Sequence, residues 1–328
     1  MPEVLLDIQN LSVEFSTASG TVRAVDDLNL TLHRGETLAV LGESGSGKSV
    51  SASVVMGILE CPPGRITSGR VLFDGTDLLT LSAEQRRRMN GARIGMVFQD
   101  ALVSLNPVYT VGWQIAEVLR VHSSISRAKA KAGAAELLSR VGIPNPVERA
   151  NSYPHQLSGG QRQRIMIAMG IALGPEVLIA DEPTTALDVT IQAQIIDLLN
   201  DLKREAHMSL ILITHDLGLV ADTAARVAVM YAGSVVESAL VEAIFKAPAH
   251  PYTKGLLHSI PGGQRGSALE PIPGAPPDLA KVPTGCPFHP RCRFTVELCR
   301  TQKPALQQLD AGRMTACHRH VELLDGQL

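Results

Sequence analysis

The sequence of 328 residues has few aromatic residues, few cysteines and little net charge. Aromatic residues make up 3% of the chain, so few side chains are present on which nucleic-acid bases could stack. The formal net charge is −2, which gives no electrostatic basis for general nucleic-acid binding. We therefore expect no nucleic-acid partner.

Long apolar runs are also lacking. No run approaches the roughly 18–20 residues that a membrane-spanning helix needs. The opening "MPEVLLDIQN" has neither the basic start nor the apolar core of a signal peptide. These absences predict a cytoplasmic protein that docks, at most, on a membrane partner. Because cytosolic thiols are kept reduced, we do not expect structural disulfides.

The periodicity of the chain predicts an α/β protein of about two domains. Alternating polarity predicts half-buried strands, and short apolar runs predict strands buried on both faces in a parallel sheet. The predicted strands are 5–15, 22–32, 36–42, 176–182, 209–216 and a pair around an Ala-Gly turn in 226–238. A helix is predicted over 48–59, and 110–150 reads as mostly helical.

"GESGSGKS", residues 42–49, matches the phosphate-loop pattern G-x-x-x-x-G-K-[ST] between a predicted strand and a predicted helix. Glycines let backbone N–H groups wrap around phosphates, and the helix N-terminus adds a favourable dipole. Lys48 is expected to reach the β- and γ-phosphates of ATP, and Ser49 to coordinate Mg²⁺. The predicted ATP-binding residues of this stretch are Gly42, Ser44, Gly45, Ser46, Gly47, Lys48, Ser49 and Val50.

A pair of acidic residues ends the predicted strand in "VLIADEP". Asp181 is expected to help hold Mg²⁺ through water, and Glu182 to polarise the attacking water as general base. Acidic residues at a strand end are common, so this prediction depends on the phosphate loop elsewhere in the chain.

"LSGGQ", residues 157–161, leads directly into a predicted helix. Here the chain resembles the ATP-binding-cassette ATPases, whose signature this is. Ser158 and two glycines at a helix N-terminus suit a second anion-binding surface. The resemblance implies that Ser158, Gly159, Gly160 and Gln161 face ATP held by the phosphate loop of another subunit. It also implies the cassette fold, with a mixed-sheet core, an antiparallel β subdomain and a helical subdomain.

The resemblance implies further site residues. Gln99 in "VFQD" is similar to the Q-loop glutamine that contacts the Mg²⁺ and water region, and Asp188 in "TALD" to the D-loop residue at the dimer interface. His215 in "ITHD" is similar to the switch histidine that contacts the γ-phosphate. Phe15 lies where the family places an aromatic ring on adenine. It also shares a strand face with Leu11 and Val13, so a core role for it stays open.

Most of the chain resembles the ATPase subunits of bacterial dipeptide and oligopeptide importers, in "SLNPVYTVG", "YPHQLSGGQ", "ADEPTTALDVTIQAQII", "HPYTKGLL" and "GCPFHPRC". The resemblance implies an ATPase at the cytoplasmic face of the inner membrane that powers peptide import by ATP-driven dimerisation. It implies as partners two membrane permease subunits, a second cassette ATPase (a relative or a copy) and, indirectly, an extracytoplasmic peptide-binding protein. The alternatives are a soluble cassette ATPase not coupled to transport, or an importer of another small solute such as nickel or glutathione. A plain P-loop kinase leaves "LSGGQ" unexplained.

The composition changes after about residue 245. We predict a cassette domain over 1–245, with its helical subdomain at about 100–165, and an extension over 246–328 made of a proline-rich connector and a cysteine-rich tail.

Four of the five cysteines lie in that tail, namely Cys286, Cys292, Cys299 and Cys317. Four thiolates suit either tetrahedral zinc or an iron–sulfur cluster. The C-x2–4-C knuckles common in zinc sites are absent, and the wider spacing favours a cubane. A tail too small to bury much core can gain folding energy from a metal. The family resemblance also implies a [4Fe–4S] cluster in some of these extensions.

Two alternatives to the cluster stay open. A mixed zinc site would add His289, His318 or His320, and simple packing would need no metal. Cys61, far away in the cassette, is expected to be a packing residue. Four arginines of the tail are candidates for offsetting the charge of a thiolate-ligated cluster, namely Arg291, Arg293, Arg300 and Arg313.

Overall fold

The computed structural model describes residues 3–18, 20–185, 187–259, 271–310 and 312–328. Residues 260–270 of the predicted proline-rich connector lie outside this description. The chain forms two compact units, each described here by itself. The first comprises Met1–His33, Thr37–Leu79 and Thr214–Leu328, and the second Arg34–Glu36 and Thr80–Ile213.

The first unit contains an antiparallel sheet with the strand order β2-β1-β4-β5. Burial alternates along its strands: Leu11 and Val13 of β1 are fully buried, while Ser12 between them is only partly buried. The two strands predicted over 5–15 and 22–32 are confirmed. The bounds are β1 Val4–Thr17, β2 Gly20–His33, β4 Gly64–Phe73 and β5 Thr76–Asp77.

Further strands of the first unit run in the order β11-β12-β10-β9-β3. β3 (Thr37–Leu41) is buried along its whole length and pairs in parallel with β9 (Arg226–Tyr231). β9 and β10 (Ser234–Leu240) form the predicted hairpin, turned by Ala232 and Gly233 with left-handed backbone. The predicted buried strand over 36–42, which precedes the phosphate loop, is confirmed as β3.

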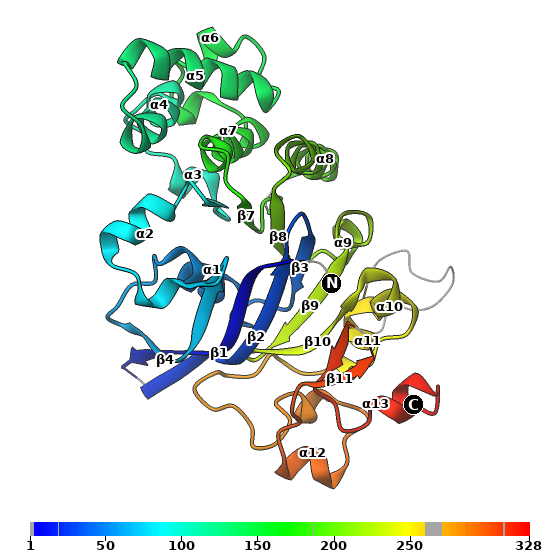
Figure 1. Cartoon of the computed structure of the whole chain (residues 1–328). Helices are drawn as coiled ribbons and strands as arrows, with labels where there is room; N and C mark the ends of the chain where they lie inside the picture. The colour runs from blue at the N-terminus through cyan, green and yellow to red at the C-terminus, as the bar shows by residue number, and fades with distance from the viewer. Residues whose placement is uncertain (1–2, 19, 186, 260–270, 311) are drawn as a thin grey trace. The chain divides into compact units, whose positions relative to one another are not determined.

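Three helices of the first unit pack against its strands: α1 (Lys48–Met56) against β2, α9 (Leu217–Thr223) against β3, and α10 (Val241–Lys246) against β9 and β10. α1 is shorter than the predicted 48–59, because Gly57 ends it in a left-handed conformation. The others are α11 Pro251–His258, α12 Glu297–Thr301 and α13 His320–Leu324. In Figure 1, α10 and α11 (yellow) lie beside β9 and β10, with the C-terminal elements (orange to red) next to them.

The C-terminal segment is more regular than its loop-like sequence suggests. β12 (Arg313–Thr315) pairs with β10 and with β11 (Gln307–Asp310), so the segment adds strands to the edge of a sheet. Its attachment is buried: the Glu237 carboxylate of β10 accepts hydrogen bonds from the Ala249 and His250 N–H groups and from Arg313. Burial raises the pKa of Glu237, and these partners satisfy the carboxylate there.

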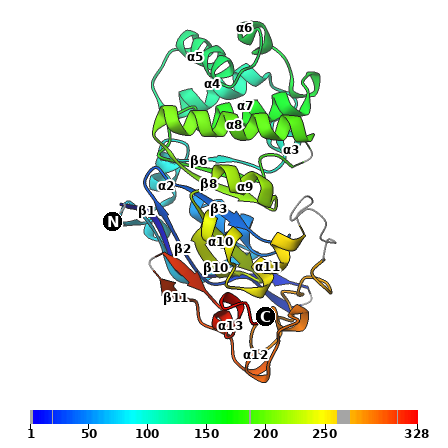
Figure 2. The same cartoon turned by 90° about the vertical axis from the view of Figure 1, so that its right-hand side faces the viewer.

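The second unit contains the parallel strands β6 (Ile94–Val97), β7 (Val177–Asp181) and β8 (Ser209–Thr214), in the order β8-β7-β6. β7 and β8 are buried throughout, as predicted for parallel strands. The helices of this unit are α2 Ala83–Met89, α3 Ala101–Ser104, α4 Val111–His122, α5 Arg127–Arg140, α6 Pro146–Arg149, α7 Gly159–Ile171 and α8 Val189–Ala206. Figure 2 shows α7 running beside α8. Within the described ranges, no helix is long and apolar enough to cross a membrane.

Candidate functional site

The phosphate loop follows β3 directly, and two of its glycines have no room for a side chain. At Gly42, a Cβ atom would lie 2.4 Å from the main-chain oxygen of Met230. At Gly47, with φ +97°, it would lie 2.5 Å from the main-chain oxygen of Ala24. Both approaches are too close for any other residue, so the loop depends on glycine for its path between β2 and β9.

The Lys48 side chain is buried inside the loop. Its ammonium group donates to the carbonyl oxygens of Gly42 (2.7 Å) and Glu43 (2.9 Å) and to the Ser46 hydroxyl (3.3 Å). Ser49, next in the chain, is exposed on the first turn of α1. The loop therefore presents a helix N-terminus, a buried cation and an accessible hydroxyl within one short stretch, which suits phosphate and Mg²⁺.

His215 and Phe15 are the other predicted site residues of the first unit. His215 is exposed between β8 and α9, where Asp216 caps α9 by accepting from the Gly218 N–H (2.8 Å). Phe15 is half-buried near the end of β1, unlike the fully buried Leu11 and Val13. Its greater exposure suits a ring that stacks on a ligand.

In the second unit the structure brings Gln99 and Glu182 together. The Gln99 side-chain amide donates to Glu182 Oε2 (3.1 Å), and the Thr185 hydroxyl donates to the same oxygen (2.8 Å). Glu182 has a left-handed backbone with φ 45°, and its N–H bonds the Ile213 oxygen (2.8 Å). Asp181, one residue earlier, is buried at the end of β7. The carboxylate of Glu182 is thus oriented by two neutral donors.

The signature residues form the start of α7. Ser158 is the N-cap residue, and its hydroxyl accepts from the Gln161 N–H (3.3 Å) while the Gln161 side chain accepts from the Ser158 N–H (3.1 Å). This reciprocal capping box fixes the helix start. At Gly160 a Cβ atom would lie 2.8 Å from the Ile191 side chain of α8, so this glycine also permits close helix packing. Asp188 in turn caps α8 by accepting from the Ile191 N–H (3.0 Å).

All four C-terminal cysteines line one small cavity in the first unit, together with His250 and two phenylalanines. Its volume of about 20 Å³ leaves room for roughly one water molecule. Gly285 makes the approach possible, since a Cβ atom there would lie 2.4 Å from the Cys299 oxygen. By contrast, Cys61 is exposed.

Burial shifts the pKa of four of the groups that line this cavity. It raises the pKa of Cys286 to about 11 and that of Cys317 to about 12, and it raises the pKa of Cys292 as well. It lowers the pKa of His250 to about 3, so the imidazole is neutral. The donor set, four thiols at one cavity, matches a thiolate-ligated metal. The arrangement of the thiols in space does not match such a site. In the described part of the chain, no group of three or more His, Cys, Asp or Glu side chains is placed to hold a metal ion.

The tail histidines and two of the four tail arginines have other partners. Ring nitrogens of His289, His318 and His320 contact main-chain oxygens, at 3.0, 2.9 and 2.8 Å respectively. Arg313 bonds the Glu237 carboxylate, not the cavity. Arg291 pairs with Glu43 of the phosphate loop. These two arginines are thus already paired with carboxylates, and their expected role in offsetting the charge of a cluster stays a prediction.

Sequence reasoning missed the contact between the phosphate loop and the cysteine-bearing segment. Glu43 stands at a variable position of the loop pattern, and Arg291 lies far away in the chain, so no local pattern links them. The same holds for Tyr252, whose hydroxyl accepts from the Glu43 N–H (2.9 Å). Only the fold places these residues at the loop.

An α/β fold with a phosphate loop between a buried strand and a helix is that of the P-loop proteins, which include ATPases, GTPases and kinases. Comparison with known proteins narrows the class. The profile of the ABC transporter family matches residues 25–185, and that of the oligopeptide/dipeptide transporter C-terminal region matches residues 236–299. This chain belongs to the ABC transporter family and is an ATPase that carries the oligopeptide/dipeptide transporter C-terminal region.

Individual relatives agree with this assignment. The chain is 49% identical over 315 residues to the dipeptide transport ATP-binding protein DppD of Escherichia coli (strain K12), with 96% of each chain covered. It is 50% identical over 304 residues to the oligopeptide transport ATP-binding protein OppD of Bacillus subtilis (strain 168), covering 92% of this chain and 85% of that protein. The dimeric structure of the ATP-binding cassette MJ0796 bound to ADP and Pi matches with a TM-score of 0.65 and 27% identity, over 72% of this chain and 99% of that one.

Proposed function

We propose that this chain is the ATP-hydrolysing subunit that powers import of dipeptides or oligopeptides through a membrane ABC transporter. The observation that carries the proposal is the match, over almost the full length, to relatives named as dipeptide and oligopeptide transport ATP-binding proteins. The phosphate loop independently supports the ATP-binding part of the proposal, because its glycines, Lys48 and Ser49 suit phosphate binding.

We propose the following roles for the site residues. Glu182 is the general base, and its orientation by Gln99 and Thr185 suits that role, since a fixed carboxylate can align a water molecule. ATP phosphates are bound by Gly42, Ser44, Gly45, Ser46, Gly47, Lys48, Ser49 and Val50. Mg²⁺ is held by Ser49 and Gln99, with Asp181 acting through water. His215 contacts the γ-phosphate, and Phe15 stacks on adenine. The residues that contact a nucleotide across a dimer interface are Ser158, Gly159, Gly160, Gln161 and Asp188.

The proposed assembly contains two permease subunits and a second cassette ATPase, which is a relative or a copy of this chain. A separate extracytoplasmic protein delivers the peptide. The chain itself is peripheral, at the cytoplasmic face of the membrane. The dimer reported for the cassette MJ0796 supports pairing of two cassettes. The names of the relatives favour peptides over nickel or glutathione, and transport over a soluble role.

The test uses the assembled transporter in lipid vesicles, with ATP hydrolysis and uptake of a labelled dipeptide measured together. Glu182→Gln should keep ATP binding and abolish hydrolysis and uptake, because the amide cannot accept a proton. Glu205→Gln, on the exposed face of α8, is the matched control and should change neither. ATP-dependent uptake of nickel or glutathione instead of peptide would overturn the substrate, and near-normal turnover of Glu182→Gln would overturn the base.

We further propose that the extension begins at about residue 246 and that Cys286, Cys292, Cys299 and Cys317 hold a [4Fe–4S] cluster, with zinc as the alternative. The support is the convergence of all four thiols on one cavity. When bound, the cluster supplies covalent cross-links between segments of the tail and so stabilises its fold. A cluster would need these thiols as thiolates, a form that burial disfavours at Cys286 and Cys317, and it would need more room than the cavity of about 20 Å³ provides.

The metal is identified by measuring iron, acid-labile sulfide and zinc per chain in protein purified without oxygen. About four irons and four sulfides per chain are expected for a cubane. About one zinc and no iron would replace the cluster by a zinc site. Absence of both, with four tail thiols free to titrate after unfolding, would contradict metal binding and leave the cysteines as packing residues.

A further inference from the structure

The second residue of the phosphate loop, Glu43, is bound by the segment that carries the cysteines. Arg291 Nη1 lies 2.7 Å from Glu43 Oε2, and Arg291 Nη2 lies 3.0 Å from Glu43 Oε1. These two parallel bonds form a bidentate pair, the strongest and most directional ion-pair geometry. The Arg291 side chain is only 7% exposed, so solvent screens the pair weakly.

Arg291 is itself held firmly. It ends a single 3₁₀ turn (His289–Arg291) between Cys286 and Cys292, and its N–H bonds the Phe288 oxygen (3.0 Å). The guanidinium also donates through Nε to the Pro273 oxygen (2.9 Å) and contacts the Tyr231 hydroxyl (3.4 Å). All of its nitrogens therefore have partners, and its position follows the position of the cysteine-bearing turn.

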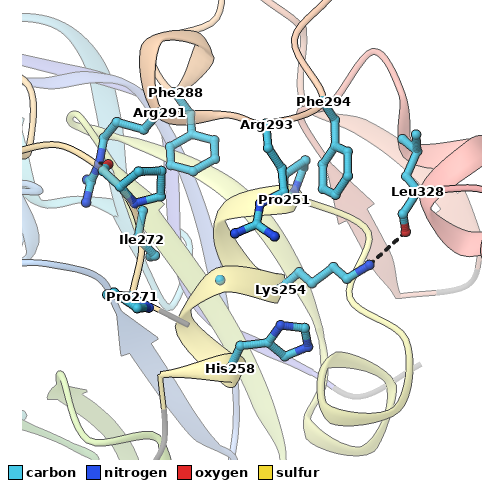
Figure 3. A pocket seen from close by; sticks show the side chains of 12 residues that line it. Pro251, Lys254, His258, Pro271, Ile272, Phe288, Arg291, Arg293, Phe294 and Leu328 are labelled. Atoms are coloured by element: carbon cyan, nitrogen blue, oxygen red, sulfur yellow. Dashed lines mark hydrogen bonds between the residues drawn. The ribbon is translucent and has the colours of Figure 1, made fainter. Parts of the chain in front are cut away.

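The pairing also decides which way the side chain points. Arg291 lines a pocket of about 380 Å³ next to α11. In Figure 3 its guanidinium lies at the margin of this pocket, apart from the charged ends of Lys254 and Arg293. The charge of Arg291 is thus directed at the phosphate loop and not into the pocket.

Glu43 is bound at its main chain as well. Its N–H donates to the Tyr252 hydroxyl of α11 (2.9 Å), and its oxygen accepts from Lys48 Nζ (2.9 Å) and from the Ser46 N–H (3.2 Å). One residue therefore connects the phosphate-binding lysine to two residues beyond position 245. A carboxylate here would also repel the phosphates of a nucleotide if it were not neutralised.

We propose that Arg291 is a positioning residue for nucleotide binding: by holding and neutralising Glu43, it makes the geometry of the cysteine-bearing turn a determinant of the affinity of the phosphate loop. This inference rests on the proposed binding of ATP at that loop. Arg291 touches no nucleotide; it acts through Glu43. A shift of the turn moves the guanidinium, and the loop then loses both its anchor and its charge compensation.

A double-mutant cycle on the purified full-length chain tests the proposal, with a fluorescent ATP analogue as the probe. Arg291→Gln should weaken binding about tenfold, which corresponds to loss of one charge-assisted pair. Glu43→Gln should weaken it by a smaller factor, about threefold, because it removes the anchor and the repulsion together. The double variant should be no worse than Arg291→Gln alone. Arg291→Lys should recover only part of the affinity, since lysine cannot bind both oxygens.

Lys303→Gln is the matched control. Lys303 forms another ion pair between the C-terminal segment and an N-terminal strand of the same unit, with Asp26 of β2 instead of the phosphate loop. It should leave nucleotide affinity unchanged. Circular dichroism and melting of each variant show whether it is folded, and Glu43→Gln, on a partly exposed side chain, keeps the test valid if Arg291→Gln does not fold.

The outcomes separate the two proposals. In the assembled transporter, a positioning role predicts a raised KM for ATP with nearly unchanged kcat. Unchanged affinity of folded Arg291→Gln, or effects of the two single variants that simply multiply, would overturn the inference while leaving ATP binding intact. If the wild-type chain and the loop variant Lys48→Ala show the same lack of nucleotide binding, the proposed function itself fails.

Discussion

The phosphate loop and the cysteine cavity are built in opposite ways. The loop takes its ligand-facing groups from one contiguous stretch, residues 42–49, and its shape from the left-handed and space-limited glycines within that stretch. The cavity takes its thiols from Cys286, Cys292, Cys299 and Cys317, and shares its lining with His250 on another segment. A contiguous site depends on local backbone geometry, whereas an assembled one depends on the packing of everything that carries it.

The two sites are nevertheless joined. Even the contiguous loop packs against main-chain atoms of β2 and β9. Its second residue, Glu43, is bound by Arg291, which lies between Cys286 and Cys292 in the chain. The difference between the two regions is therefore one of degree: local geometry decides whether a phosphate site exists, and tertiary contacts decide how firmly it is held.

The largest effect that would sharpen the comparison is expected from Gly47→Ala. The new methyl group would meet the Ala24 oxygen at 2.5 Å in a backbone with φ +97°. We expect nucleotide binding to fall about a hundredfold or more, measured by titration with a fluorescent ATP analogue.

Gly45→Ala is the control for that change. Gly45 also has a left-handed backbone, but nothing lies within 4 Å of its added Cβ atom. Only backbone strain remains, so we expect a loss of about tenfold or less. Equal losses for both variants would show that the close approach to β2 does not determine the loop.

An intermediate effect is expected in the reactivity of the thiols of the purified chain. Cys61 is exposed, whereas Cys299 and Cys317 are buried. We expect an alkylating reagent at pH 8 to modify Cys61 at least about tenfold faster than the buried pair, read out by mass spectrometry of the peptides. If the cavity is one cooperative assembly, its cysteines should then become reactive together as urea is raised. If the cysteines became reactive one by one, the cavity would not be a single cooperative assembly.

The smallest effect is expected at a group of ion pairs that is open to solvent. Glu176, just before β7, accepts from Arg93 and from Arg34 (2.8 Å), and the bond from Arg93 is the main reason that its pKa is lowered. A lowered carboxyl pKa adds stability above the unfolded value of about 4.5, and this stability is lost as the pH falls through the folded value.

Glu176→Gln should therefore destabilise the protein by only about 0.5 kcal/mol at pH 7, since each side chain is about one third exposed. The difference from wild type, measured by urea unfolding, should shrink below pH 4. Glu205→Gln, which breaks the longer and more exposed pair with Arg140, should have no measurable effect. A loss at Glu176 as large as that of a buried pair would show that burial does not set the scale.

Much of the fold could be predicted because its signals are local. Alternation along β1 and β2, the apolar runs of β3, β7 and β8, and the Ala-Gly turn after β9 each depend on neighbours in the chain. The missed features are non-local. The pairing of β12 with β10 needs Thr315 to meet Glu237, and no pattern within either segment announces it.

The candidate site divides in the same way. The spacing of glycines and a lysine identified the phosphate loop, and "LSGGQ" identified the start of α7. Both could be predicted because the backbone conformations involved depend on the residues of the motif itself. The assignment of Ser158 to a nucleotide stays a prediction, and the structure adds that its hydroxyl caps α7, a role that sequence reasoning did not foresee. The contact of Gln99 with Glu182 emerged only from the fold, since the residues that carry it are far apart in the chain.

The sequence by itself thus determined the class of the protein, the position of its phosphate loop and the identity of the four tail thiols, because these depend on residue types and short spacings. The tertiary structure alone decided that the thiols share one cavity and that Arg291 holds Glu43. Such pairings require segments distant in the chain to pack together, and the free energy that selects them comes from burial of the whole assembly and not from any one stretch.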